Sequence, residues 1–284
     1  MIVPNTYLLT GLPRAGTTLC CHILNSHPNT LALHEPLSPE DFNPILGKEH
    51  ALAQITEFAL ATRSSVVEKG MAQSRHKNGE VPDNPVALTA AAGSLRAMDV
   101  TLGEIDVGHR GLQQNFNLII KHNALFTALL PELAVQFPVY GIVRNPLAVL
   151  ASWNSVDLPV NTGHIPAGEK FCPELRQKLA SLPDKFDRQL CILEWFCARF
   201  IVSLPNRVLR YEEFVERPEL VANIMQLYGV NQQHQSARQS RNQHYDLALM
   251  ESLYAKLKHY GEAIWHFYTA DQVDELMESI RKSA

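Results

Sequence analysis

The chain of 284 residues lacks several features that would assign it to a specialised class of protein. Its five cysteines are odd in number and show no C-x-x-C spacing, which indicates reduced, buried thiols and no disulfide framework. No apolar run is long enough to span a membrane. The twelve histidines show no H-E-x-x-H or similar spacing, so we expect no bound metal. No G-x-S-x-G motif of a serine hydrolase is present.

An excess of positive charge is also missing. The formal net charge is −4, which argues against general binding of nucleic acid, because that requires a basic face. The first residues, MIVPNTYLL, contain no basic segment of the kind that begins a secretory signal. We therefore expect a cytoplasmic, bacterial protein made of one domain over residues 1–284.

The most informative stretch lies near the start of the chain. Tyr7 to Leu9 read as a buried strand, GLPRAGTT at 11–18 as a glycine-bearing loop, and residues 19–24 as the start of a helix. A strand, a glycine loop and a helix N-terminus together form a site for a phosphate-like anion. The pattern differs from the P-loop of nucleoside triphosphatases, because Thr17 occupies the position of the usual lysine and Arg14 is the loop's only cation.

Strands and helices alternate along most of the chain. Further strands are expected at 31–33, 117–120, 139–143 and 208–211. Helices are expected at 125–134, from 146 onward with Asn145 as the N-cap, at 186–204 and from 270 onward, and residues 157–170 are expected to form a loop. This order predicts an α/β, P-loop-type three-layer fold, in which helices flank a central parallel sheet. Residues 37–112 are interpreted as a helical insertion, with helices at 46–61 and 86–102 and a mobile, turn-rich loop between them.

Polar side chains follow four of the expected strands. They are Arg14, Glu35, the pair Lys121 and His122, and Arg144. The carboxyl ends of parallel strands share one edge of a sheet, where ligands bind in open α/β folds. The sequence thus predicts a site for a multiply anionic ligand, with a group that removes a proton. Ser152 lies two turns into the helix after Arg144, and the two could reach one phosphate together.

These motifs resemble those of sulfotransferases that use 3′-phosphoadenosine 5′-phosphosulfate (PAPS). GLPRAGTT at 11–18 is similar to the family's 5′-phosphosulfate loop, in the arginine form of tyrosylprotein and many bacterial members. IVRNPLAVLASW at 142–153 resembles the 3′-phosphate motif. VLRYEE at 208–213 and the segment around KHYG at 258–261 are weaker matches to later family motifs.

The resemblance implies a role for each matching residue. Arg14, Ala15, Gly16, Thr17 and Thr18 would hold the 5′-phosphosulfate. Arg144 and Ser152 would hold the 3′-phosphate, Tyr211 would lie near the adenine, and Lys258 would add a 3′-phosphate contact. At this last position the family's R-K-G reads Lys258-His259-Tyr260-Gly261.

The implied reaction transfers a sulfuryl group from PAPS to a hydroxyl or amine acceptor and releases 3′,5′-bisphosphoadenosine (PAP). Arg14 and Lys121 would stabilise the leaving phosphate. Glu35 and His122 compete for the role of catalytic base, and we favour Glu35, which goes with the arginine-type loop. A small-molecule kinase with a degenerate P-loop and a non-catalytic nucleotide-binding protein remain alternatives. The acceptor and the oligomeric state stay open.

Overall fold

The computed structural model describes residues 3–91, 93–227 and 246–283, and it contains a five-stranded parallel sheet at its centre. The strand order is β2-β5-β1-β6-β7. The bounds of the strands are β1 Thr6–Gly11, β2 Thr30–His34, β5 Asn117–Lys121, β6 Val139–Val143 and β7 Val208–Arg210. The predicted α/β fold with a central parallel sheet is therefore confirmed.

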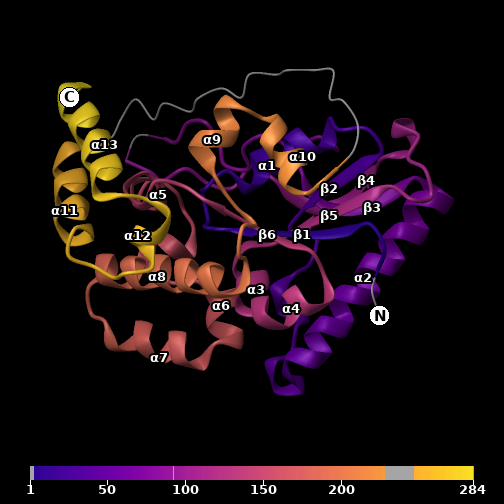
Figure 1. Cartoon of the computed structure of the whole chain (residues 1–284), viewed down its shortest axis with the longest axis horizontal. Helices are drawn as coiled ribbons and strands as arrows, with labels where there is room; N and C mark the ends of the chain where they lie inside the picture. Colours follow the sequence, from indigo (N-terminus) through magenta and orange to yellow (C-terminus); the bar gives the residue numbers. More distant parts are fainter. Residues whose placement is uncertain (1–2, 92, 228–245, 284) are drawn as a thin grey trace.

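Helices cover both faces of the sheet (Figure 1). On one face lie α1 (Thr17–Asn25), α9 (Tyr211–Glu216) and α10 (Glu219–Ile224). The other face carries α3 (Asn123–Ala128), α4 (Leu130–Gln136) and α8 (Lys185–Ser203). The remaining helices are α2 Gly47–Lys69, α5 Pro146–Trp153, α6 Pro166–Phe171, α7 Pro173–Ser181, α11 Leu247–Leu257, α12 Ile264–Phe267 and α13 Ala270–Ser283, and short 3₁₀ turns cover Pro39–Asp41, Pro44–Leu46, Gly108–Arg110 and Pro159–Thr162.

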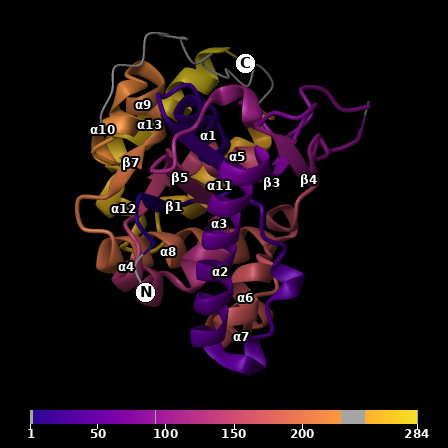
Figure 2. The same ribbon diagram turned by 90° about the vertical axis from the view of Figure 1, so that its right-hand side faces the viewer.

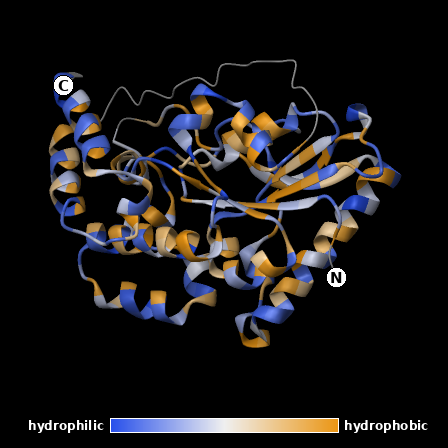
Figure 3. Cartoon of the chain, in the orientation of Figure 1, coloured by the Kyte–Doolittle hydropathy of each residue, from blue (hydrophilic) through white to orange (hydrophobic). Residues whose placement is uncertain are grey.

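The central strands are apolar on both faces, as a parallel sheet between two helical layers requires. Every residue of β2 and β6 is buried, and Figure 3 shows the strands and the inward sides of the helices as mainly hydrophobic. Within the described part of the chain, no helix is both long and apolar enough to cross a membrane.

The insertion differs from its prediction. Its first helix is confirmed and extends further, as α2, to Lys69. The helix expected at 86–102 is wrong: the described residues of this range form turns and isolated bridges, and they lead into β4 (Thr101–Asp106). β4 pairs antiparallel with β3 (Met71–His76), and Figure 2 shows this hairpin beside α2. The spacing of apolar residues alone predicted a helix here, but most of the described alanines in this range are exposed and form no buried helical face. The division into one domain with an insertion stays a prediction.

Two further expectations need correction. The helix expected at 125–134 is split into α3 and α4, because Leu129 leaves the helical conformation just before Leu130 and Pro131 begin a new helix. The loop expected at 157–170 contains a 3₁₀ turn and the start of α6. In contrast, the expected N-cap of α5 is confirmed: the side chain of Asn145 accepts a hydrogen bond from the Leu147 amide at 3.1 Å.

The strand register places the ends of β2 and β5 at the same level and the end of β1 two residues beyond it. Lys121, at the end of β5, stands opposite Leu9 of β1 and His34 of β2. The residues that follow these strands therefore gather at the carboxyl edge of the sheet.

Candidate functional site

The glycine loop between β1 and α1 is tightly built. Gly16 is the N-cap of α1 with a φ of 88°, and a Cβ atom there would lie 2.4 Å from the Tyr211 ring. A Cβ atom on Gly11 would lie 2.5 Å from the Thr17 side chain. Both positions thus require glycine, which lets the loop close around the N-terminus of α1. Thr17 and Thr18, the first residues of that helix, line the adjoining cavity.

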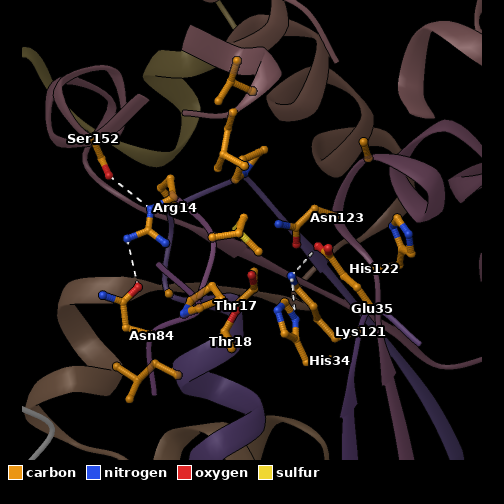
Figure 4. Close-up of a pocket in the computed structure, with 18 of the residues that line it drawn as sticks. Arg14, Thr17, Thr18, His34, Glu35, Asn84, Lys121, His122, Asn123 and Ser152 are labelled. Carbon is orange, nitrogen blue, oxygen red and sulfur yellow. Dashed lines mark hydrogen bonds and ion pairs between the residues drawn. The ribbon is translucent and has the colours of Figure 1, made fainter. Parts of the chain in front are cut away.

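Arg14 lies across this loop and contacts two other segments of the chain. Its Nε donates a hydrogen bond to Ser152 Oγ at 3.3 Å, and its Nη2 donates to Asn84 Oδ1 at 3.1 Å (Figure 4). The pKa of Arg14 is lowered to about 10, mainly by burial and then by the charges of Arg96 and Arg144. Arg14 therefore lies in a region of concentrated positive charge.

Arg144 joins the same cluster from the end of β6. Its Nη1 donates to the Arg14 carbonyl at 3.2 Å, and its guanidinium lies over the Tyr211 ring at 4.5 Å from the centroid. Neither Arg14 nor Arg144 forms an ion pair with a carboxylate in the described part of the chain. Two arginines without a carboxylate partner, beside a helix N-terminus, form a site suited to an anion.

A second cluster lies at the ends of β2 and β5. Lys121 is only 2% exposed, and its Nζ contacts Glu35 Oε1 at 2.6 Å and His34 Nδ1 at 3.4 Å (Figure 4). Burial alone would raise the pKa of Glu35, but the neighbouring Lys121, with smaller contributions from His34 and His122, holds it well below its ordinary value. Arg75 of β3 adds a longer contact to Glu35, at 4.0 Å. Glu35 is therefore ionised at neutral pH.

Three buried polar atoms surround this pair without a hydrogen-bond partner in the described residues. They are His34 Nε2, His122 Nδ1 and Asn123 Oδ1. Burial lowers the pKa of His34 to about 3 and that of His122 to about 4, so both imidazoles are neutral at pH 7. Figure 4 shows the Asn123 side chain directed toward the Glu35 carboxylate. Buried polar atoms of this kind usually mark water or ligand contacts.

Both clusters line one cavity of about 720 Å³. The end of the cavity near Arg14 and Arg144 is cationic. The wall formed by residues 158–167 is largely aliphatic. The residues that line it include Arg14, Gly16, Thr17, Thr18, Glu35, Asn84, Arg96, Lys121, His122, Asn123, Arg144, Ser152 and Tyr211. A cavity of this size fits a small-molecule site. The described residues contain no group of three or more His, Cys, Asp and Glu side chains arranged to hold a metal ion.

Most residues singled out from the sequence line this cavity. Ala15 is a buried residue of the loop and does not line it. Lys258 does not line it either, and its Nζ contacts Asp274 at 3.3 Å and Tyr254 at 3.1 Å. Sequence reasoning missed Asn84, Arg96 and Asn123. Only Asn123 had a local signal, because it directly follows Lys121 and His122.

Comparison with known proteins returned distant relatives, and no family model matches the chain. The nodulation protein NoeE of Sinorhizobium fredii (strain NBRC 101917 / NGR234) is 25% identical in a match that covers 76% of this chain and 48% of NoeE. The chain thus spans about half the length of this relative. Among solved structures, the sulfotransferase STF1 of Mycobacterium tuberculosis H37Rv matches with a TM-score of 0.39 and 15% identity, over 92% of this chain and 78% of STF1. This structural likeness is too distant to carry a functional argument.

Proposed function

We propose that the chain is a PAPS-dependent sulfotransferase that acts on a hydroxyl or amine acceptor. The observation that carries this proposal is the arrangement of one cavity. A cluster of arginines and Ser152 at the glycine loop faces the same space as the buried Lys121–Glu35 pair. The first cluster suits a bisphosphorylated nucleotide, and the second suits transfer of a group to an acceptor that loses a proton.

PAPS would supply an activated sulfuryl group, whose bond to the bridging phosphate oxygen breaks as a bond from sulfur to the acceptor forms. In this proposal, Thr17, Thr18 and the amides at the start of α1 bind the 5′-phosphate. Arg144 and Ser152 bind the 3′-phosphate, and Tyr211 lies beside the adenine. Arg14 and Lys121 stabilise the negative charge that develops on the bridging oxygen. These roles match the positive charge and the hydroxyl groups of the site.

The acceptor's proton passes to a base in this mechanism. We assign the role to Glu35, because its carboxylate is ionised and lies beside Lys121 in the cavity. His122 is the alternative base: its imidazole is neutral and its Nδ1 has no protein partner among the described residues. Glu35 and Lys121 thus form a matched pair, one group accepting a proton and the other stabilising the leaving group.

Turnover of labelled PAPS tests the proposal. The protein is incubated without magnesium with PAPS and a panel of phenols, sugars, alcohols and tyrosine peptides, and PAP is quantified by chromatography. We expect PAP and a sulfated product from the wild type, and a rate lower by about 100-fold or more in Glu35→Gln, because general-base catalysis contributes about that much.

Glu57→Gln serves as the matched control, since Glu57 is exposed on α2 and does not line the cavity. A normal rate in Glu35→Gln together with an inactive His122→Ala would transfer the role of base to His122. Formation of ADP from magnesium-ATP, with no PAP formed from PAPS, would replace the proposal by the kinase alternative.

A further inference from the structure

The residues between β3 and β4 bring a third arginine to the nucleotide end of the cavity. We name the described residues 77–91 and 93–99 the insertion loop. Asn84 of this loop accepts a hydrogen bond from Arg14 at 3.1 Å, and Asp83, Asn84, Pro85, Arg96 and Met98 line the cavity together with Arg14, Arg144 and Ser152. The insertion loop is therefore part of the wall that faces the proposed nucleotide.

Arg96 is held in place by its backbone as well as its side chain. Its amide donates to the Ser155 carbonyl at 3.3 Å, and its carbonyl accepts from the Asp157 amide at 2.9 Å. Its Nη2 donates to Ser155 Oγ at 2.7 Å. Ser155 lies two residues after the end of α5 and three residues after Ser152, the proposed 3′-phosphate ligand. These contacts fix the Arg96 side chain beside that end of α5 before any ligand binds.

The insertion loop is also braced internally. Ala87 donates from its amide to the Ala97 carbonyl at 3.0 Å, and Asp99 donates to the Pro85 carbonyl at 2.8 Å. Val86 and Met98 form an antiparallel bridge between these two bonds. Asn84 and Arg96 therefore flank the two ends of one small paired structure, Asn84 next to the 85–99 pair and Arg96 next to the 87–97 pair, and both line the cavity.

The charges of the three arginines act on one another. Arg96 and Arg144 both lower the pKa of Arg14, after the larger effect of burial. Such mutual repulsion is relieved when an anion binds among the cations. At the position where the sequence resemblance implied a further 3′-phosphate contact, Lys258 is instead paired with Asp274 outside the cavity lining.

We propose that Arg96 is a binding residue for the 3′-phosphate of the nucleotide, acting with Arg144 and Ser152. This inference rests on the proposed function, because it assumes that the cavity binds PAPS and PAP. It assigns to the insertion loop the task of completing the nucleotide site. The expected ligand is a nucleotide with a phosphate on its 3′ oxygen.

The test compares the affinities of PAP and 5′-AMP, which lacks the 3′-phosphate, by calorimetry in wild type and Arg96→Gln. A hydrogen bond to a charged group is worth a factor of about 10 to 100 in affinity, so Arg96→Gln should lower the affinity for PAP by that factor. The affinity for 5′-AMP should stay the same. Arg96→Lys should recover part of the loss, because it keeps the charge and loses the fork of donors.

Arg176→Gln is the matched control, since Arg176 is an exposed arginine of α7 that does not line the cavity. An unchanged affinity for PAP in Arg96→Gln would overturn the inference. Equal losses for PAP and 5′-AMP would also overturn it, because they would reveal only a general loosening of the loop. A wild type that binds PAP no more tightly than 5′-AMP would instead contradict the proposed function itself.

Discussion

At the scale of single residues, two residues of the site have unusual backbone conformations. Arg14 and Glu35 have φ angles of 68° and 43°, in the left-handed region. Most other residues of this kind in the described chain are asparagines, which tolerate that region well. Arginine and glutamate do not, and each costs about 1–2 kcal/mol there. Backbone strain held by the surrounding structure is common at functional sites, and here it falls on two of the residues proposed for catalysis.

The choice between the two candidate bases depends on their surroundings. Glu35 carries a charge and lies against Lys121, whose attraction lowers the carboxylate's pKa and makes it a weak base. His122 is neutral, and burial lowers its pKa to about 4. A nucleotide bound beside Lys121 would compete for that ammonium group and raise the basicity of Glu35. This coupling favours Glu35 as the base in the complete complex.

The buried histidines predict a loss of stability in acid. His34 and His122 have folded pKa values of about 3 and 4, below the ordinary 6.5, so the unfolded chain binds more protons than the folded chain between these values. Stability should therefore fall as the pH drops from 6.5 toward 4, by up to about 3 kcal/mol for each histidine. The lowered pKa of Glu35 adds a further loss below about pH 4.3, the unfolded value.

Urea unfolding at pH 7 and pH 4.5 measures this dependence. His34→Asn and His122→Asn should each flatten it, whereas His109→Asn, which alters an exposed histidine, should leave it unchanged. Stability that is equal at both pH values in the wild type would show that neither imidazole is held neutral by the fold.

At the scale of elements, helix α5 connects the two residues proposed to bind the 3′-phosphate to the rest of the molecule. Arg144 precedes this helix and Ser152 lies within it. Asn145 caps it, donates from its backbone amide to Glu212 at 3.0 Å, and donates from its side chain to the Gln272 carbonyl of α13 at 3.0 Å. One residue therefore sets both the start of α5 and its contact with the C-terminal helices.

Removing this cap should affect both stability and binding. Asn145→Ala should lower the free energy of unfolding by about 1 kcal/mol, the usual value of an N-cap. The substitution should also lower the affinity for PAP, because Ser152 and Arg144 lose their fixed orientation. Asp246→Ala is the control: Asp246 caps α11 through the Leu249 amide at 3.1 Å and does not line the cavity. Chemical denaturation and calorimetry of both variants make the comparison. Equal PAP affinities in the two variants would contradict the proposed role of α5.

The elements differ in how well the sequence predicted them. The core strands, the glycine loop and the cap of α5 were readable because local patterns of apolar, glycine and capping residues determine them. The conformation of the insertion loop could not be predicted in this way. It depends on pairing between residues 85–87 and 97–99 and on the hydrogen bonds of Arg96 to Ser155. Such long-range contacts leave no periodic signal, so the roles of Asn84 and Arg96 emerge only from the structure.

At the scale of the whole molecule, the parallel sheet brings distant segments to one edge. Arg14, Glu35, Lys121 and Arg144 lie at or just after the ends of four different strands, yet all four line one cavity. This grouping could be anticipated from the sequence because strand ends in a parallel sheet are aligned. The division into an arginine cluster and a lysine–glutamate pair required the structure. It is this division that supports transfer between a nucleotide and an acceptor.

The most direct test of the account is calorimetric binding of PAP without magnesium, with 5′-AMP and ATP as controls. We expect PAP to bind at least about tenfold more tightly than 5′-AMP, because in the proposed site Arg144 and Ser152 bind the 3′-phosphate. Arg144→Ala should remove this advantage. No binding of PAP, or a preference for ATP that appears with magnesium, would contradict the central claim that this cavity binds a sulfuryl donor.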